Sequence, residues 1–424
     1  MEKQTIKYLI KDYQKMAREI EYVPRDMEFD ENANYILIGV RRAGKSYMMY
    51  QDIYCQILSG KISAERFVYL NFEDERLCGI KKEELNLIIE SYQEMYGMEK
   101  PYIYFDKIQN IDGWEKFVRR LADMKYRIMV TGSNAKMLSS DIATTLGGRF
   151  IPRYVYPFSF HEFTKFYSIE LNENWEYDHG KCVSVFNAFE QYFEYGGFSE
   201  CYRLQNKIEY LNSLYQKILL GDIVQRHQIR NPRVFRLLGK KTAESIMQPV
   251  SLSRMKNIIQ STGDNVSFPL LKDYYDYMTD ACLIFELPNM ASRLAQRETI
   301  KKKYFIDNGI LRVFLTDNIS PMLENLVAVT LFRKFRSDEE PRLFYYNKGV
   351  EIDFCIPEEK LAIQVSVDIS QSIDTYSREM SSLLKFLDAN EEYSGLIITY
   401  NQEKVISTGN RDINVVPIWK WLLK

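Results

Sequence analysis

A glycine-rich segment between an apolar run and a helical pattern constrains the fold of this chain more than any other feature. The apolar run is YILIGV, residues 35–40, and the segment GVRRAGKS extends from Gly39 to Ser46. The spacing G-x-x-x-x-G-K-S, after a strand and before a helix, is that of a phosphate-binding loop. Its glycines let the backbone curl so that amide N–H groups and the helix N-terminus face an anion. The segment therefore predicts a nucleotide site on a strand–loop–helix unit.

The residue types of this loop predict how it would hold its ligands, ATP and Mg²⁺. We expect Lys45 to reach the β- and γ-phosphate oxygens and the Ser46 hydroxyl to ligate Mg²⁺. The remaining contacts would come from the backbone of the loop and of the first helical turn. The predicted nucleotide-binding residues are Gly39, Val40, Arg41, Arg42, Ala43, Gly44, Lys45, Ser46 and Tyr47.

Short apolar runs alternate with helical patterns around this loop. Apolar runs occupy residues 35–40, 66–73, 102–106 and 127–133, and helical patterns cover 5–20, a segment from Lys45, 82–96 and 113–124. Buried strands that are separated by helices form parallel sheets with both faces covered. We therefore expect an α/β fold with the loop at the carboxyl edge of a parallel sheet.

The run YIYFD, residues 102–106, brings Asp106 to that same carboxyl edge, where it can hold the Mg²⁺ shell together with Ser46. A second acid would be expected after Asp106, but the chain carries Lys107. A charged lysine cannot accept a proton from the attacking water, so hydrolysis becomes a separate question from binding.

Three acids near the sheet edge could take over the role of the missing acid. They are Glu73, Asp74 and Asp112, and the sequence does not rank them.

Three polar residues at or after the end of the fourth apolar run complete the candidate catalytic set. Ser133 and Asn134 end a strand and could sense the γ-phosphate, although a turn or a helix N-cap would also explain them. Arg149, after Leu-Gly-Gly, could be an arginine finger for a neighbouring subunit or a structural ion-pair arginine. The candidate catalytic residues are Asp106, Lys107, Ser133, Asn134 and Arg149.

The second half of the chain has a different pattern. Residues 182–220 are mainly helical, and helical patterns between 240 and 305 end in the hairpin-like pair CLIFEL (282–287) and KYFIDN (303–308). Helices closed by a hairpin suggest a winged helix-turn-helix. Residues 321–424 read as a second, smaller α/β unit.

A series of short segments, taken in order, identifies a family. The segments are GVRRAGKS, NFEDER (71–76), YFDKIQNIDGWE (104–115), VTGSNAKMLSS (130–140), LGGRF (146–150), PFSFHEF (157–163), YGGFSE (195–200), KYFIDNG (303–309) and GVEIDF (349–354). With them the chain strongly resembles the bacterial and archaeal AAA+ ATPases that carry a C-terminal domain of poorly defined function. The resemblance covers nearly the whole chain.

This resemblance implies a domain organisation and ligands. It implies an N-terminal helix and P-loop ATPase core at 1–155, a helical lid at 156–220, a winged-helix-like domain at 221–320 and a restriction-endonuclease-like domain at 321–424. The implied ligands are ATP and Mg²⁺, nucleic acid or a protein is the implied partner, and a homo-oligomeric ring would be typical.

The last domain departs from a metal-dependent nuclease of the PD-(D/E)-x-K type. Strand alternation puts Glu351 and Asp353 on one face, and Glu324 on the preceding helix could complete an acidic cluster. On the next strand, Gln364 stands at the second-acid position and Ser366 at the lysine position. Without those charges, Mg²⁺ affinity and water activation fall, so we expect a binding fold that does not cut.

Charge gives little information about partners. With 56 basic and 58 acidic side chains the net charge is −2, and the basic clusters at Arg226–Arg233, Lys301–Lys303 and Arg333–Arg336 could simply be solvated faces. A helix at 267–281 carries three aspartates that a phosphate backbone would repel. The lysines at 301–303 are therefore the better candidates for nucleic-acid contact.

The chain has the composition of a cytoplasmic protein with no membrane partner. It has no apolar run of membrane-spanning length, and its six cysteines form no C-x-x-C pair.

Three functions fit these observations. The first is an ATPase that acts as a nucleotide-driven switch or remodeller. The second is a nucleic-acid-binding module for which ATP is a structural or regulatory ligand. The third and weakest is an ATP-gated nuclease.

Overall fold

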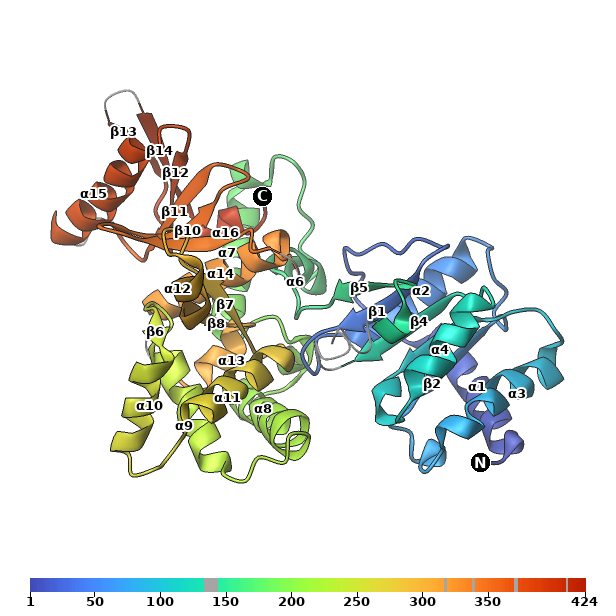
Figure 1. The fold of residues 1–424 in the computed structure, drawn as a ribbon. Helices are drawn as coiled ribbons and strands as arrows, with labels where there is room; N and C mark the ends of the chain where they lie inside the picture. The colour runs from blue at the N-terminus through green and yellow to red at the C-terminus, as the bar shows by residue number, and fades with distance from the viewer. Residues whose placement is uncertain (133–143, 316–318, 338–339, 370–372, 409–410) are drawn as a thin grey trace. The chain divides into compact units, whose positions relative to one another are not determined.

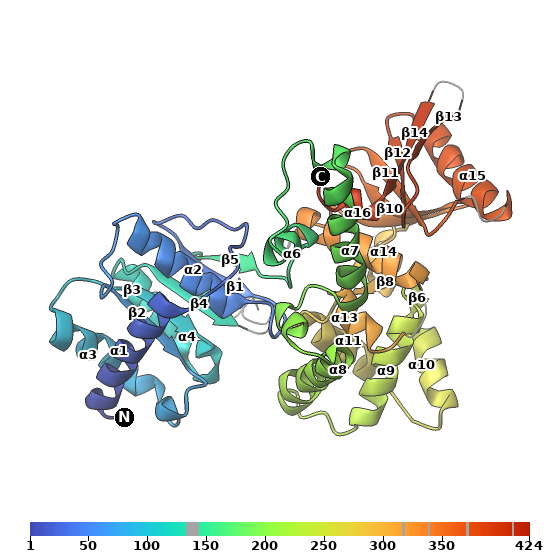
Figure 2. The same ribbon diagram turned by 180° about the vertical axis from the view of Figure 1, so that it is seen from behind.

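The computed structural model describes residues 1–132, 144–315, 319–337, 340–369, 373–408 and 411–424, and the backbone alone for 373–379. The chain folds into two compact units, which Figures 1 and 2 show from opposite sides. The N-terminal unit comprises Met1–Tyr156 with Asp280–Cys282, and the C-terminal unit comprises Pro157–Thr279 with Leu283–Lys424.

The N-terminal unit is built on a five-stranded sheet in the order β2-β3-β4-β1-β5, and every pairing in it is parallel. Its strands are β1 (Asn34–Ile38), β2 (Phe67–Asn71), β3 (Tyr102–Asp106), β4 (Ile128–Gly132) and β5 (Phe150–Tyr154). Its helices are α1 (Lys3–Glu19), α2 (Lys45–Leu58), α3 (Asn86–Tyr96) and α4 (Trp114–Asp123), with 3₁₀ turns η1 (Glu75–Leu77), η2 (Lys82–Glu84) and η3 (Ile108–Asn110). The predicted α/β fold with a parallel sheet is confirmed.

The direction of the strand connections places helices on both faces of this sheet. The chain moves from β1 to β2 in one direction across the sheet and from β3 to β4 in the other. Because such crossovers are right-handed, α2 and α4 lie on opposite faces. Figure 1 shows α4 in front of the sheet, and Figure 2 shows α2 in front of it.

A buried ion pair fastens α2 to the sheet. Asp52 of α2 is 4% exposed and accepts hydrogen bonds from both terminal nitrogens of Arg127, at 2.6 and 3.1 Å. The Tyr104 hydroxyl of β3 donates a third hydrogen bond to the same carboxylate at 2.6 Å. Burial and the neighbouring Asp52 raise the pKa of Tyr104 well above its usual range, so the phenol stays protonated and donates.

The C-terminal unit contains two sheets and most of the helices. Its helices are α6 (Phe160–Phe166), α7 (His179–Tyr195), α8 (Lys207–Lys217), α9 (Pro232–Glu244), α10 (Leu252–Ser261), α11 (Phe268–Asp280), α12 (Leu294–Thr299), α13 (Asn308–Arg312), α14 (Ile319–Phe335), α15 (Ile373–Ala389) and α16 (Ile418–Trp421). Shorter turns are η5 (Trp175–Tyr177) and η6 (Ser199–Arg203), and a π-helical segment, η7 (Ile218–Gln225), continues α8.

The larger sheet has six strands in the order β13-β14-β12-β11-β10-β9. Its strands are β9 (Phe344–Asn347), β10 (Glu351–Ile356), β11 (Leu361–Ser366), β12 (Ser394–Thr399), β13 (Lys404–Thr408) and β14 (Arg411–Pro417). β11, β12 and β14 are parallel, and the other pairings are antiparallel. α15 packs on β10–β12 through an apolar cluster that includes Leu383, Phe386 and Leu387.

The smaller sheet lies next to three helices, α9, α10 and α11 (Figure 1). Its strands β6 (Val250–Ser251), β7 (Ile284–Pro288) and β8 (Ile300–Phe305) pair antiparallel in the order β6-β8-β7. α14 contacts both β8 and β11, so this sheet is packed against the larger one within the same unit.

A buried carboxylate explains two of the sequence segments that identified the family. Asp307, in KYFIDNG, accepts hydrogen bonds from the backbone N–H groups of Gly197 and Gly309, at 2.7 and 2.8 Å. A Cβ at Gly196, in YGGFSE, would lie 1.8 Å from this carboxylate, and Gly196 has a φ of +73°. Burial raises the pKa of Asp307 to about 6. Both segments therefore have a structural role at the end of α7.

We expect Arg127→Met to destabilise the chain strongly, because it leaves Asp52 buried without its counter-charge. The expected loss in the free energy of unfolding is about 3–5 kcal/mol, measured by urea denaturation followed by circular dichroism. The matched control is Arg66→Met, which removes a surface pair with Glu99 and should cost less than about 1 kcal/mol. Equal losses in the two variants would contradict this role of Arg127.

Candidate functional site

In the glycine-rich loop between β1 and α2, the backbone conformation and the close packing require glycine at two positions. Gly44 has a φ of +97°, in the left-handed region that favours glycine, and Arg42 has a φ of +66°. At Gly39, a Cβ would lie 2.0 Å from the carbonyl oxygen of Val155. The first glycine is therefore required by close packing against the chain after β5, and the second by the turn into α2.

The loop surrounds the ammonium group of Lys45. Lys45 is 8% exposed, and its Nζ donates hydrogen bonds to the carbonyl oxygens of Gly39 at 2.7 Å and Val40 at 2.9 Å. α2 begins at Lys45, so its first-turn amides have no partners within the helix and can face phosphate oxygens. Tyr47, at 40% exposure, lies on the outer side of this first turn.

Arg25 braces the loop, and the sequence pattern did not identify it. Its guanidinium donates hydrogen bonds to the carbonyl oxygens of Ala43 at 3.1 Å and Tyr156 at 2.9 Å, and its own backbone pairs with Gln51. Arg25 lies in a polar segment of irregular structure, where nothing in the spacing indicates a partner. Only the folded chain brings it to the loop.

The carboxylate of Asp106 collects hydroxyl groups from three elements. Ser46 of α2 donates at 2.6 Å, Tyr69 of β2 donates at 3.0 Å, and Thr131 of β4 donates to the other carboxylate oxygen. Asp106 is only 2% exposed. Burial, and then the charge of Asp106, raises the pKa of Tyr69 well above its usual range, which keeps that hydroxyl protonated.

Ser46 and Asp106 thus lie together at the carboxyl edge of the sheet. A hydroxyl and a carboxylate are the hard oxygen donors that Mg²⁺ prefers, and Mg²⁺ typically uses only one or two protein ligands beside phosphate oxygens. The donor set therefore fits a Mg²⁺ ion bound together with a nucleoside triphosphate.

Lys107 points toward an acid on the neighbouring strand. Its Nζ forms an ion pair with Glu73, and its backbone N–H donates to the Thr131 hydroxyl at 2.9 Å. Glu73 also lies 4.0 Å from the guanidinium of Arg41 in the loop. The residue after Asp106 is thus connected through Glu73 to the glycine-rich loop.

The remaining predicted site residues are not at this edge or lie outside the described part of the chain. Ser133 and Asn134 fall within 133–143, outside the described residues. Arg149 directly precedes β5, and its backbone carbonyl accepts a hydrogen bond from Asn34, the first residue of β1. Its side chain pairs with Asp123. Arg149 is therefore at the amino edge of the sheet, roughly 16 Å of strand away from the loop in the same chain.

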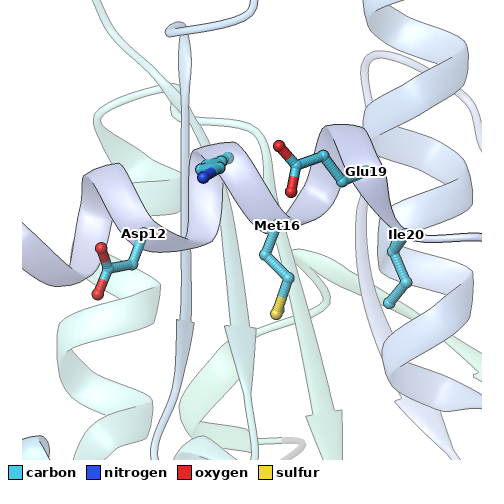
Figure 3. Close-up of a pocket in the computed structure, with 5 residues that line it drawn as sticks. Asp12, Met16, Glu19 and Ile20 are labelled. Atoms are coloured by element: carbon cyan, nitrogen blue, oxygen red, sulfur yellow. The ribbon is translucent and has the colours of Figure 1, made fainter.

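A shallow depression on α1 is lined by residues of that helix and its C-cap, and not by residues of the glycine-rich loop. It is lined by Asp12, Lys15, Met16, Glu19 and Ile20 (Figure 3). All five residues lie on α1 or at its C-cap, so the depression contains none of the predicted nucleotide-binding residues.

A second cluster of charges lies between the two sheets of the C-terminal unit. The Lys302 ammonium group of β8 lies 3.2 Å from carboxylate oxygens of Glu324 and Glu351 and 3.3 Å from Asp353. Lys302 is 0% exposed. We call Lys302, Glu324, Glu351 and Asp353 the acidic centre. Its three acids were grouped from the sequence, but Lys302 was not placed with them.

Further hydrogen bonds complete the acidic centre. Tyr304 donates to Glu324 at 2.7 Å, and the backbone N–H of Val365 donates to Asp353 at 2.9 Å. Burial would lower the pKa of Lys302, but the three carboxylates more than offset this and raise it. Burial raises the pKa of Glu324 to about 7.

The expectation that Lys301–Lys303 would contact nucleic acid is wrong. Lys302 and Lys303 are buried, and Lys303 pairs with Glu286 at 3.3 Å. Lys301 pairs with Glu286 and Glu298. These side chains belong to β8 inside the small sheet rather than to an exposed wing, because antiparallel pairing with β6 and β7 draws them into the unit.

Within the described ranges, no group of three or more histidine, cysteine, aspartate or glutamate side chains is placed to hold a metal ion. In the same ranges, no helix combines the length and apolar character needed to cross a membrane.

Two family models match the chain. Residues 31–164 match an AAA domain, and residues 186–320 match a domain of unknown function (DUF8612). An uncharacterized protein of Methanocaldococcus jannaschii, MJ1544, is 31% identical over 98% of this chain and 94% of its own length. An uncharacterized protein of Haemophilus influenzae is 28% identical over 92% of this chain and 94% of its own length.

Solved structures show weaker similarity. The Walker-type ATPase PABY2304 of Pyrococcus abyssi has 15% identity and a TM-score of 0.40, and the match covers 70% of this chain and 99% of that one. Cdc6p from Pyrobaculum aerophilum has 14% identity and a TM-score of 0.25, with coverage of 68% and 87%.

We expect Lys302→Met to destabilise the chain by about 3–5 kcal/mol, because Glu324 and Asp353 then stay buried without a cation. Lys301→Met, which removes only the partly exposed pairs of the neighbouring residue, should cost less than about 1 kcal/mol. Urea denaturation of the two variants at pH 7.5 measures both losses. Similar losses would show that the acidic centre does not depend on Lys302.

The same variant should show a characteristic pH dependence. Because the pKa of Glu324 is raised from 4.5 to about 7, the folded chain holds a proton that the unfolded chain releases in this window. The contribution of this group to stability therefore falls as pH rises from about 4.5 to 7. Without Lys302 the pKa of the Glu324 carboxyl group rises further, so the deficit of Lys302→Met should grow as pH is raised above about 7. A constant deficit would contradict this.

Proposed function

Because this chain belongs to one family with its uncharacterized Methanocaldococcus jannaschii relative and its residues 31–164 match an AAA domain, we propose that it is a nucleotide-driven switch that binds ATP with Mg²⁺. The observation that carries the proposal is the 2.6 Å hydrogen bond between Ser46 and Asp106 beside the buried ammonium of Lys45. It joins the loop after β1 to the end of β3 at one edge of the sheet. These are the groups that phosphate and a hard cation require.

Each of these groups has a defined task in binding. Lys45 would exchange its two loop carbonyls for phosphate oxygens, and the first-turn amides of α2 would hold the phosphates by their N–H groups. Ser46 and Asp106 would hold Mg²⁺, which neutralises charge on the phosphates. Arg25 keeps Ala43 in place, so the loop is formed before the nucleotide arrives.

The C-terminal unit is the proposed output of the switch. We interpret α9–α11 with the β6-β8-β7 sheet as a winged helix, and the six-stranded sheet as a nuclease-like fold that binds a partner without cutting it. The acidic centre supports the second interpretation, because a wholly buried lysine occupies the space among its carboxylates. A phosphodiester or a metal would have to displace Lys302 first, which does not favour an ATP-gated nuclease.

A second candidate function, ATP-regulated nucleic-acid binding, is favoured by the surface of α9. Arg233, Arg236 and Lys240 are exposed and spaced by three and four residues, so they lie on one side of the helix. Arg233 pairs with Asp264 at 3.3 Å but stays 70% exposed. α11 carries the exposed acids Asp273 and Asp276, so α9 is the better phosphate-facing surface of this region.

A homo-oligomer remains a prediction of the proposed function. Arg149 lies at the amino edge of its own sheet, so it could act as an arginine finger only on the nucleotide of a neighbouring subunit.

Loss of the loop lysine tests the proposed nucleotide site. We expect Lys45→Ala to weaken binding of a fluorescent ATP analogue by more than about 10-fold, because it removes the charge that faces the phosphates. Asp106→Asn should abolish the gain in affinity that Mg²⁺ provides. The matched control is Lys61→Ala, at an exposed lysine paired with Glu31, which should bind as the unchanged chain does. If the unchanged chain does not bind the analogue with Mg²⁺, the proposal is wrong.

Salt-dependent binding tests the second candidate function. If α9 faces a duplex, replacing Arg233, Arg236 and Lys240 by glutamine should weaken binding and lower the slope of log K against log salt by roughly 0.9 for each lost phosphate contact. The matched control replaces three exposed lysines of the N-terminal unit, Lys15, Lys81 and Lys82. Fluorescence anisotropy with a labelled duplex measures both. An equal loss in the control would indicate non-specific attraction to charge.

A further inference from the structure

We propose that Glu73 is the acid that orients the water for ATP hydrolysis in this chain, and that Lys107 positions Glu73 for this task. The inference rests on the proposed nucleotide site and extends it from binding to turnover. It also explains how a chain with a lysine after Asp106 can retain an acid at the sheet edge.

The backbone fixes Glu73 next to the end of β3. β2 and β3 are parallel neighbours, with Asn71 opposite Asp106. The N–H of Phe72 donates to the carbonyl oxygen of Asp106 at 2.9 Å, and the N–H of Glu73 donates to the side chain of Asn71 at 3.0 Å. Glu73 therefore leaves β2 at a defined point beside the Mg²⁺-binding acid rather than on a free loop.

The side chain of Glu73 faces the nucleotide loop. Its carboxylate pairs with Lys107 on one side and lies 4.0 Å from Arg41 of the loop on the other. It is 40% exposed, so water and a nucleotide can reach it. Its carboxylate oxygens can therefore accept a hydrogen bond from water.

Lys107 has a backbone conformation that serves this contact. Its φ of +58° and ψ of +35° are left-handed, which is uncommon for a residue with a side chain. The N–H of Lys107 is held by the Thr131 hydroxyl, which also donates to Asp106. The turn after Asp106 is thus fixed by the same groups that fix the Mg²⁺-binding acid, and it directs the lysine to Glu73.

The other acids that the sequence left open are less suited to the task. Asp74 accepts hydrogen bonds from Arg76 and from Tyr13 of α1. These contacts, with Arg76 first, lower the pKa of Asp74 and direct it toward α1. Asp112 lies in the exposed turn before α4. Glu73 is the acid among these three that contacts both Lys107 and the loop.

In the proposed step, the oxygen of water forms a bond to the γ-phosphorus of ATP. The bond between that phosphorus and the β–γ bridging oxygen breaks, and ADP leaves with its electron pair. Glu73 orients the water through a hydrogen bond and accepts its proton, which then passes to the released phosphate. The products are ADP and inorganic phosphate, and no further reactant is needed.

The test measures phosphate release with ATP and Mg²⁺, and separately the Kd of a non-hydrolysable ATP analogue, on the full chain. Glu73→Gln should lower kcat by about 100-fold and change the Kd of the analogue by less than about 3-fold. Lys107→Met should lower kcat by about 10-fold, and Lys107→Arg should recover most of it, because arginine keeps the pairing charge. Glu75→Gln, an exposed acid two residues away, is the matched control and should behave as the unchanged chain.

A double variant distinguishes loss of the acid that orients water from general damage to the site. Lys107→Glu supplies an acid after Asp106, so Glu73→Gln/Lys107→Glu should hydrolyse ATP at least about 10-fold faster than Glu73→Gln alone.

Three results would overturn the inference. In the first, Glu73→Gln hydrolyses ATP as fast as the unchanged chain. In the second, the unchanged chain binds the analogue but releases no phosphate while Lys107→Glu does; the nucleotide switch would then stand without Glu73 as its acid. In the third, the unchanged chain does not bind the analogue at all, and the proposed function fails together with this inference.

Discussion

The hydrogen bonds to the Asp106 carboxylate are the interactions on which the N-terminal unit depends. A buried carboxylate must have partners, and this one takes hydroxyl groups from Ser46, Tyr69 and Thr131, which lie on three different elements. The hydrogen bonds therefore fix the end of β3 against α2, β2 and β4 at once. The same geometry leaves a hydroxyl and a carboxylate together at the mouth of the loop. The hydrogen bonds that satisfy the buried Asp106 carboxylate thus also form the site that we propose for Mg²⁺.

The buried carboxylates of the acidic centre in the C-terminal unit are satisfied in a different way from Asp106. There the carboxylates of Glu324 and Asp353 are satisfied by an internal cation, Lys302, so the chain itself supplies the positive charge. The buried ammonium group of Lys302 thereby links β8 of the smaller sheet to β10 of the larger one. The two acidic sites of this chain differ because hydroxyl groups satisfy the carboxylate of Asp106, whereas an internal ammonium group satisfies those of Glu324 and Asp353.

The parts of the fold that were predictable are those that depend on local sequence. Strands such as 102–106 are short apolar runs between helical patterns, and the loop from Gly39 to Ser46 has a fixed spacing. The contacts that were missed are long-range. Arg25 reaches Tyr156 across 131 positions, and Lys302 reaches Asp353 across 51. No periodicity or spacing encodes such pairs, because the intervening chain can fold back in many ways.

The sequence by itself determined that this chain has a parallel α/β sheet with a nucleotide-type loop, because hydrophobic periodicity and glycine spacing are properties of neighbouring residues. It also showed that a lysine follows Asp106. Only the tertiary structure decided what that lysine contacts, because Glu73 is 34 positions away and becomes its neighbour through the pairing of β2 with β3. It likewise decided that Lys302 is buried, since exposure is a property of the packed chain and not of its composition.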